Sequence, residues 1–387
     1  MRNLHLIATG GTISCVPSPN GLVPSLSAKD LLSYVPGGGE ISCTDLFHMD
    51  SSNIQPEEWQ QMAEAVMAAR EHCAGIVMTH GTDTMAYTAS MLSFMLRSIE
   101  IPVVLTGSQY PIVRPDSDGR RNLENAIIAA RELPGGVYIV FGDAVIKGCR
   151  AVKTRTTSLN AFESINYPYI GAVANGGFIS FVRPEPRETF ECFTAIDPAV
   201  ALIKLIPGTS PALLESVAGC GIHGVVVEAF GLGGVHNFRR DHAMSLKHLI
   251  ERDIPVVLTS QCLYEASSPD IYEVSHALRD SGVISAADMT TEAAVTKLMW
   301  ALGQGMDQAE IAAFFTTVVD ELHAQEDMAA IGQWLAGPES YYLQYFVDED
   351  SVLRPGLHAP SKEKMRAFLQ ILRQTIPNAH IRGEEND

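Results

Sequence analysis

Short apolar runs alternate with helix-like patterns along the first 180 residues of the chain. The runs typical of strands are residues 4–8, 76–78, 103–105 and 137–141. Apolar residues recur at helical spacing in residues 56–66, 87–96 and 122–132. Because strands and helices that alternate along a chain build parallel sheets, this pattern predicts an α/β domain with a mainly parallel sheet.

A second and smaller α/β pattern begins near residue 201, with strands predicted at 225–227 and 255–259 and a helix at 289–302. The polar segment 182–188 holds two prolines and is the best linker candidate. We therefore divide the chain into four parts. These are a larger N-terminal α/β domain (1–182), a linker (183–200), a smaller C-terminal α/β domain (201–323) and an appended C-terminal extension (324–387). An amphipathic stretch at 365–372 predicts that the extension packs on the C-terminal domain or a subunit interface.

The charge balance limits the partners that this protein can take. The 387 residues include 27 Lys and Arg against 45 Asp and Glu, a formal net charge of −18. Such a charge repels phosphate backbones and anionic lipid, so we expect neither a nucleic-acid nor a membrane partner. The seven cysteines form no Cys-x-x-Cys pair, which gives no sign of a metal site or a disulfide framework. With no secretory signal recognised, these features predict a cytoplasmic protein.

Two polar motifs follow predicted strands, where open α/β sheets bind ligands. The first is TGGTI at residues 9–13, whose glycines let the backbone approach a ligand and whose threonines supply hydroxyls. Its alternative interpretation is an ordinary tight turn, and it lacks the spacing of a dinucleotide-binding loop. The second is HGTDT at residues 80–84. Its alternative interpretation is that Thr82 or Asp83 caps the following helix.

Two further candidates have ordinary explanations when each is taken alone. The polar cluster MDSSN at residues 49–53 precedes a predicted helix, and Ser52 or Asn53 could simply cap it. Lys153 follows a strand region and has uncharged neighbours. A lone lysine is usually a solvated surface charge, but a lysine near a carboxylate in a cleft can assist a nucleophile or a base.

The two motifs together, about 70 residues apart, resemble the bacterial L-asparaginase family, and further matches favour its cytoplasmic, type I branch. The matching segments are residues 49–52, 85–90, 106–109, 117–119, 122–123, 260–262 and 287–290. The resemblance covers roughly residues 1–323. It implies two α/β domains, no metal, no organic cofactor, and a homodimer or homotetramer.

The resemblance also implies residue roles. Thr12 would be the nucleophile that attacks the side-chain amide of asparagine. The second catalytic group would consist of Thr82, Asp83 and Lys153. Asp83 would also hold the substrate α-ammonium, Ser51 would bind its α-carboxylate, and Ser52 and Gly11 would lie in the same pocket. Backbone N–H groups near Thr12 and Thr82 would stabilise the oxyanion.

One position departs from the family pattern. A gap-free reading places Leu22 where the family usually has a tyrosine that helps to activate the nucleophile, and leucine cannot relay a proton. Two alternatives to asparagine hydrolysis therefore stay open. The chain could act on glutamine or another small amino acid amide, or it could be a catalytically weak sensor that binds asparagine. Related amidotransferase subunits that act on charged tRNA carry an extra N-terminal domain, and the acidic charge disfavours that function.

Overall fold

The computed structural model describes residues 3–182, 189–267 and 282–316, together with 341–343, 369–370, 373 and 379–381. The chain forms two compact units, Met1–Phe315 and Thr316–Asp387. In the second unit, β19 (Tyr341–Leu343) pairs in parallel with β20 (Ala379–Ile381). Residues 183–188 of the predicted linker, and all of the amphipathic stretch 365–372 except 369–370, lie outside the described residues.

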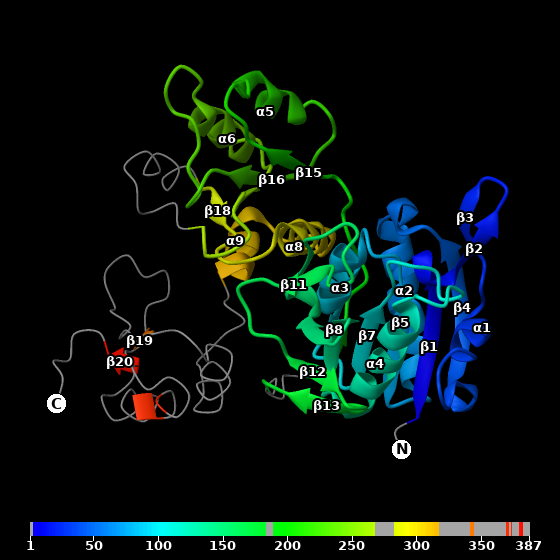
Figure 1. Ribbon diagram of the computed structural model, residues 1–387. Coiled ribbons are helices and arrows are strands. Elements are labelled where there is room, and N and C mark those ends of the chain that lie inside the picture. Colours follow the sequence, from blue (N-terminus) through cyan, green and yellow to red (C-terminus); the bar gives the residue numbers. More distant parts are fainter. Residues whose placement is uncertain are drawn as a thin grey trace. The chain divides into compact units, whose positions relative to one another are not determined.

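The first unit contains an eight-stranded sheet in the order β13-β12-β9-β8-β7-β5-β1-β4, drawn from blue to green in Figure 1. The strands that pair in parallel are β4 (Ser42–Met49), β1 (Leu4–Gly10), β5 (Gly75–Thr79), β7 (Pro102–Thr106) and β8 (Gly136–Phe141). The antiparallel strands are β9 (Ala144–Lys147), β12 (Gly171–Ala174) and β13 (Gly177–Ser180). The predicted mainly parallel sheet is confirmed.

Helices cover both faces of this sheet because its strands are apolar on both sides. Along β1, Leu6 packs with the core on the side of α1 (Ala28–Leu32) and α4 (Gly119–Glu132). The next residue, Ile7, packs with the core on the side of α2 (Pro56–Arg70) and α3 (Met85–Met95). The helix predicted after Pro56 is confirmed, and it buries the four apolar residues that define its pattern: Trp59, Met62, Ala63 and Val66.

A smaller parallel sheet in the order β15-β16-β17-β18 forms the C-terminal domain. Its strands are β15 (Val200–Lys204), β16 (Gly224–Ala229), β17 (Val256–Ser260) and β18 (Ile284–Ser285). One face packs with α5 (Pro211–Val217) and α6 (His242–Ile250), as Figure 1 shows. The remaining described helices of the unit are α8 (Thr291–Gly303) and α9 (Gln308–Thr316). The predicted two-domain α/β architecture is therefore confirmed.

Helix α8 joins the two domains, because it contacts both α3 and the C-terminal sheet. Its buried Leu298 and Trp300 belong to the same apolar core as Ile7 of β1 and Val226 of β16. In the described part of the chain, no helix combines the length and the apolar character that a bilayer crossing needs. The two domains thus share one core.

Short elements complete the fold around the large sheet. They are η1 (Thr12–Ser14), β2 (Cys15–Ser18), β3 (Gly21–Pro24), η2 (Gly38–Glu40), η3 (Ser51–Asn53), β6 (Leu96–Arg97), η4 (Gly148–Arg150), β10 (Ala151–Lys153), β11 (Phe162–Ser164) and β14 (Glu191–Cys192). Three of them, η1, η3 and β10, carry residues that the sequence marks as candidates for chemistry.

Candidate active site

The carboxyl ends of neighbouring parallel strands bring the predicted motifs to one edge of the large sheet. Ala8 of β1 lies opposite Thr79 of β5, and Thr79 lies opposite Thr106 of β7. Hydrogen bonds fix these ends: the Thr9 hydroxyl donates to the Thr79 carbonyl (2.7 Å), and the His80 N–H donates to the Thr106 carbonyl (2.8 Å). The loops that follow β1 and β5 therefore start side by side.

Glycines let three of these loops touch. A Cβ at Gly11 would lie 2.4 Å from the backbone nitrogen of Gly81, and Gly11 has a φ of +77°. A Cβ at Gly81 would lie 2.5 Å from the hydroxyl oxygen of Ser51. No other amino acid fits at Gly11 without displacing the backbone of the neighbouring loop. The segments around residues 11, 51 and 81 thus form one continuous surface.

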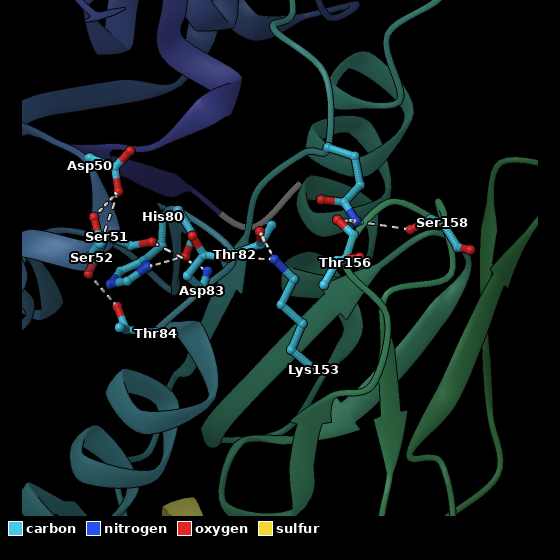
Figure 2. Close-up of polar contacts among 12 residues, drawn as sticks. Asp50, Ser51, Ser52, His80, Thr82, Asp83, Thr84, Lys153, Thr156 and Ser158 are labelled. Carbon is cyan, nitrogen blue, oxygen red and sulfur yellow. Dashed lines mark hydrogen bonds and ion pairs between the residues drawn. The ribbon is translucent and has the colours of Figure 1, made fainter. Parts of the chain in front are cut away.

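Lys153 reaches this surface from the end of β10. Its Nζ donates to the Thr82 hydroxyl at 2.8 Å and forms an ion pair with Oδ1 of Asp83 at 2.6 Å. Figure 2 shows the lysine side chain extended toward Thr82. Only 16% of this side chain is exposed, so the alternative interpretation as a solvated surface lysine is wrong. The capping interpretation of Thr82 and Asp83 is also wrong, because Thr84 is the N-cap of α3.

Thr12 is the first residue of η1 and directly follows Gly11. Since Gly11 packs on Gly81, the loop that carries Thr12 lies against the loop that carries Thr82. Within the described part of the chain, the hydroxyl of the half-buried Thr12 has no hydrogen-bond partner. A hydroxyl without such a partner, on a loop that packs against the loop of Thr82 and Asp83, is suited to nucleophilic attack on a carbonyl carbon.

Ser51 is 3% exposed and connects η3 to the loop after β5. Its hydroxyl oxygen accepts from the Asp83 N–H at 3.3 Å, and its carbonyl accepts from the Thr84 hydroxyl at 2.8 Å. The proton of its hydroxyl has no acceptor among the residues that the structure describes. Ser51 can therefore donate to an anion at this edge of the sheet.

Ser52 turns toward Asp50 instead, as Figure 2 shows. Its hydroxyl and its N–H both donate to Oδ1 of Asp50, at 2.6 and 2.9 Å, and these bonds lower the pKa of the Asp50 carboxyl. Asp50 caps η3, whereas the N-cap of α2 is Gln55. The interpretation of Ser52 or Asn53 as the cap of that helix is therefore wrong.

Sequence reasoning missed the roles of two polar side chains at this edge. His80 is fully buried, its Nδ1 lies 2.7 Å from the Gly81 carbonyl, and burial lowers its pKa to about 4. The amide of Gln109 donates to the carbonyls of Thr156 and Ser158 at 3.1 and 3.0 Å, which fixes the loop after Lys153. Both residues stand in motifs that follow strands, so their position in the sequence was a usable signal.

Leu22 lies in the antiparallel hairpin of β2 and β3 and is 57% exposed. The hairpin is tied to η1, because the N–H groups of Ser25 and Leu26 both donate to the Ser14 carbonyl at 3.0 Å. Leu22 thus stands on the segment that follows Thr12, and it offers no polar atom there. Among the described residues, no group of three His, Cys, Asp or Glu side chains is placed to hold a metal ion.

Comparison with known proteins agrees with this geometry. Residues 3–186 match the family model "Asparaginase, N-terminal", and residues 199–315 match "Glutaminase/Asparaginase C-terminal domain". The chain is 43% identical over 317 residues to an L-asparaginase of Thermococcus kodakarensis, covering 80% of this chain and 95% of that protein. It is 34% identical over 350 residues to a glutamyl-tRNA(Gln) amidotransferase subunit of Metallosphaera sedula, covering 86% and 79%. The solved structure of the thermostable L-asparaginase from Thermococcus kodakarensis superposes with a TM-score of 0.77 at 41% identity, covering 81% of this chain and 96% of that one.

Proposed function

We propose, from the premise that the chain belongs to the asparaginase family, that it hydrolyses L-asparagine to L-aspartate and ammonia. The single observation that carries this proposal is the contact of Lys153 with Thr82 and Asp83, whose loop packs against the Thr12 loop. The related L-asparaginase covers most of the chain and supports the same reaction. That relative is archaeal, so membership of the bacterial type I branch stays a prediction.

In the proposed reaction, the Thr12 hydroxyl attacks the amide carbon of the substrate and loses its proton to the Lys153–Thr82 pair. The negative charge that develops on the amide oxygen is stabilised by the backbone N–H groups of Thr12 and Thr82, for which the described residues offer no acceptor. The C–N bond then breaks, the nitrogen takes up a proton, and ammonia leaves. A β-aspartyl ester on Thr12 remains, and water cleaves it to aspartate and the free threonine.

The charges of the site suit a free amino acid. Oδ1 of Asp83 is paired with Lys153, and Oδ2 has no partner in the described part of the chain, so it can accept from the substrate α-ammonium. The Ser51 hydroxyl, whose proton has no acceptor among the described residues, can donate a hydrogen bond to the substrate α-carboxylate. A buried hydroxyl donor beside an exposed carboxylate therefore matches the two charged groups of asparagine.

The test is release of ammonia from L-asparagine by the purified protein and by Thr12→Ala. We expect the wild-type protein to release ammonia and Thr12→Ala to lose at least about 100-fold in kcat. Thr44→Ala, at an exposed threonine of β4, is the matched control and should keep full activity. A wild-type protein that releases no ammonia, or a fully active Thr12→Ala, would contradict the proposal.

Another amide is the second candidate, and Leu22 is the observation that favours it. Without a hydroxyl at this position, the pocket differs from that of family members with a tyrosine there. To distinguish asparagine from another amide as the substrate, kcat/KM is measured for asparagine, for glutamine and for other small amino acid amides.

Binding of asparagine with no turnover of any amide would instead indicate a sensor. Because one relative is an amidotransferase subunit, charged tRNA is a further substrate to test. The net charge of −18 disfavours binding of tRNA.

We also propose that the protein is cytoplasmic and forms a homodimer or homotetramer. All seven cysteines are free, which suits a reducing compartment. Light scattering coupled to size exclusion measures the assembly directly. Removing residues 324–387 should change the assembly or the melting temperature if this extension packs on the protein as predicted, and unchanged values would contradict that prediction.

A further inference from the structure

A chain of hydrogen bonds runs from α2 through α3 to the loop after β5. The Trp59 indole N–H donates to the Thr88 hydroxyl at 2.9 Å, and that hydroxyl lies 3.0 Å from Nε2 of His80. Nδ1 of His80 lies 2.7 Å from the Gly81 carbonyl oxygen. Thr88 and His80 are fully buried and Trp59 is 6% exposed, so water does not compete for these bonds.

The chemistry of the groups fixes every proton in this chain. An indole nitrogen can only donate, so the Thr88 oxygen accepts from Trp59 and keeps its own proton for Nε2 of His80. A carbonyl oxygen can only accept, so Nδ1 of His80 carries the proton that Gly81 receives. His80 is therefore a neutral imidazole protonated at Nδ1.

This tautomer holds one peptide bond in place. All described peptide bonds are trans, so the Gly81 carbonyl and the Thr82 N–H point in opposite directions. With the carbonyl held against the buried imidazole, the Thr82 N–H points away from the core. It has no acceptor among the described residues, and the loop that carries Thr12 packs on Gly81, the residue directly before this N–H.

We propose that His80 is a positioning residue for the amidase reaction, which aims the Thr82 N–H at the developing oxyanion by holding the Gly81 carbonyl. Thr88 and Trp59 act behind it by keeping the proton of His80 on Nδ1. The role rests on the proposed function, because only an amide substrate supplies that oxygen. A preorganised donor of this kind stabilises the transition state more than the bound substrate.

Two variants of His80 distinguish the effect of its hydrogen-bond donor, Nδ1–H, from the effect of the volume of its ring. His80→Leu fills the space without a donor, whereas the Nδ2 of His80→Asn branches from Cγ as Nδ1 does and can still reach the Gly81 carbonyl. Since loss of an oxyanion donor costs about 100- to 1,000-fold, we expect His80→Leu to lower kcat about 10- to 100-fold with KM changed less than about threefold. His80→Asn should recover much of that loss.

A second pair of variants leaves the loop itself untouched. Thr88→Val removes the hydroxyl that fixes the tautomer, and Thr88→Ser keeps it. We expect Thr88→Val to lower kcat more than Thr88→Ser does, at similar KM. Equal kcat values for His80→Leu and the wild type, or equal losses in both members of each pair, would overturn the positioning role.

Nitrogen-15 NMR of the histidine side chains gives a readout that needs no activity. The wild-type protein should show His80 with a protonated Nδ1 and an unprotonated Nε2. A proton on Nε2 instead overturns the assignment. A wild-type protein that has this tautomer and releases no ammonia would sink the proposed function, and the catalytic role with it. One that is active, loses activity in Thr12→Ala and tolerates His80→Leu would sink the positioning role alone.

Discussion

The two larger sheets of the first unit both have strands that end in glycine-containing loops, but different constraints require the glycines. After β1, a Cβ at Gly11 would lie 2.4 Å from the backbone of another loop. After β16, a Cβ at Gly231 would meet no atom within 4 Å, and only its φ of +48° favours glycine. In the N-terminal domain, glycine allows two loops to touch, whereas in the C-terminal domain it allows one loop to turn.

The surroundings of the two glycine-containing loops distinguish a candidate active site from a simple turn, which their sequences alone do not. The residues TGGTI and GLGG both follow parallel strands and would pass as similar loops. Of these two loops, only the first packs against a second polar loop, whose Asp83 forms an ion pair with Lys153 of β10. The carboxyl edge of a sheet thus becomes a candidate site where loops from several strands converge.

The largest effect should come from Gly11→Ala compared with Gly231→Ala. Gly11→Ala forces a Cβ onto the Gly81 backbone and should lower the free energy of unfolding by about 3 kcal/mol or more, with loss of amidase activity. Gly231→Ala meets only backbone strain and should cost about 1–2 kcal/mol with activity kept. Urea unfolding and ammonia release measure both. Similar losses in the two variants would erase the contrast between the loops.

Lysines of the two domains give the next comparison. Lys153→Met should lower kcat about 100- to 10,000-fold with the fold intact, because it removes the proton-transfer group beside Thr82. The control is Lys204→Met in β15. The Lys204 side chain is 58% exposed and its ion pair with Glu228 is weak, so activity should stay unchanged. Circular dichroism checks that both variants fold. An active Lys153→Met would remove the lysine from the mechanism.

Acid should destabilise the protein through His80. Its pKa is lowered from 6.5 to about 4, so the unfolded chain takes up a proton that the folded protein excludes as the pH falls through this window. Stability linked to this group is therefore complete above about pH 6.5 and declines by about 3 kcal/mol toward pH 4. Urea unfolding at several pH values tests this. His80→Leu should show a smaller slope between pH 6.5 and 4, and an unchanged slope would refute the assignment.

A rise in pH from 4.5 toward 7 should have the opposite effect, of similar size, through Glu292 of α8. Burial, with Glu228 nearby, raises its pKa from 4.5 to about 7. The folded protein thus holds a proton that the unfolded chain releases, so stability is complete below about pH 4.5 and declines by about 3 kcal/mol toward pH 7. Glu292→Gln should flatten this part of the profile. If Glu292→Gln has the same slope of unfolding free energy against pH as the wild type, the Glu292 carboxyl does not cause that slope.

Much of the fold follows from local patterns. The parallel strands β1, β5, β7 and β8 and the helices α2, α3 and α4 were predicted because each carries its own apolar pattern, whereas β4 was not, because its residues are mostly polar and exposed. The antiparallel strands β9, β12 and β13 were not expected, because they are four residues long and depend on pairing with partners elsewhere. Short strands without alternation give no local signal for their neighbours.

The candidate site was predictable as far as strand ends could place it. Thr12 and Thr82 follow adjacent strands, so the contact between their loops follows from the topology, and Lys153 was linked to them through the family resemblance. The interaction of Trp59 with Thr88 escaped prediction, because Trp59 fits the apolar face of its helix and a helical pattern does not reveal which neighbour its N–H will meet. A threonine on the buried face of the next helix was the available hint.

The distances along the chain between the partners of this site have a consequence for folding. Thr9 and Thr79 are 70 residues apart, and Thr82 and Lys153 are 71 residues apart. On the ribosome, the loop of Thr12 therefore emerges long before the lysine that completes its surroundings. Contacts that close such long loops form late, so in refolding the return of catalysis should lag behind the return of helical signal. The return of turnover during refolding therefore marks the time at which these long-range contacts have formed.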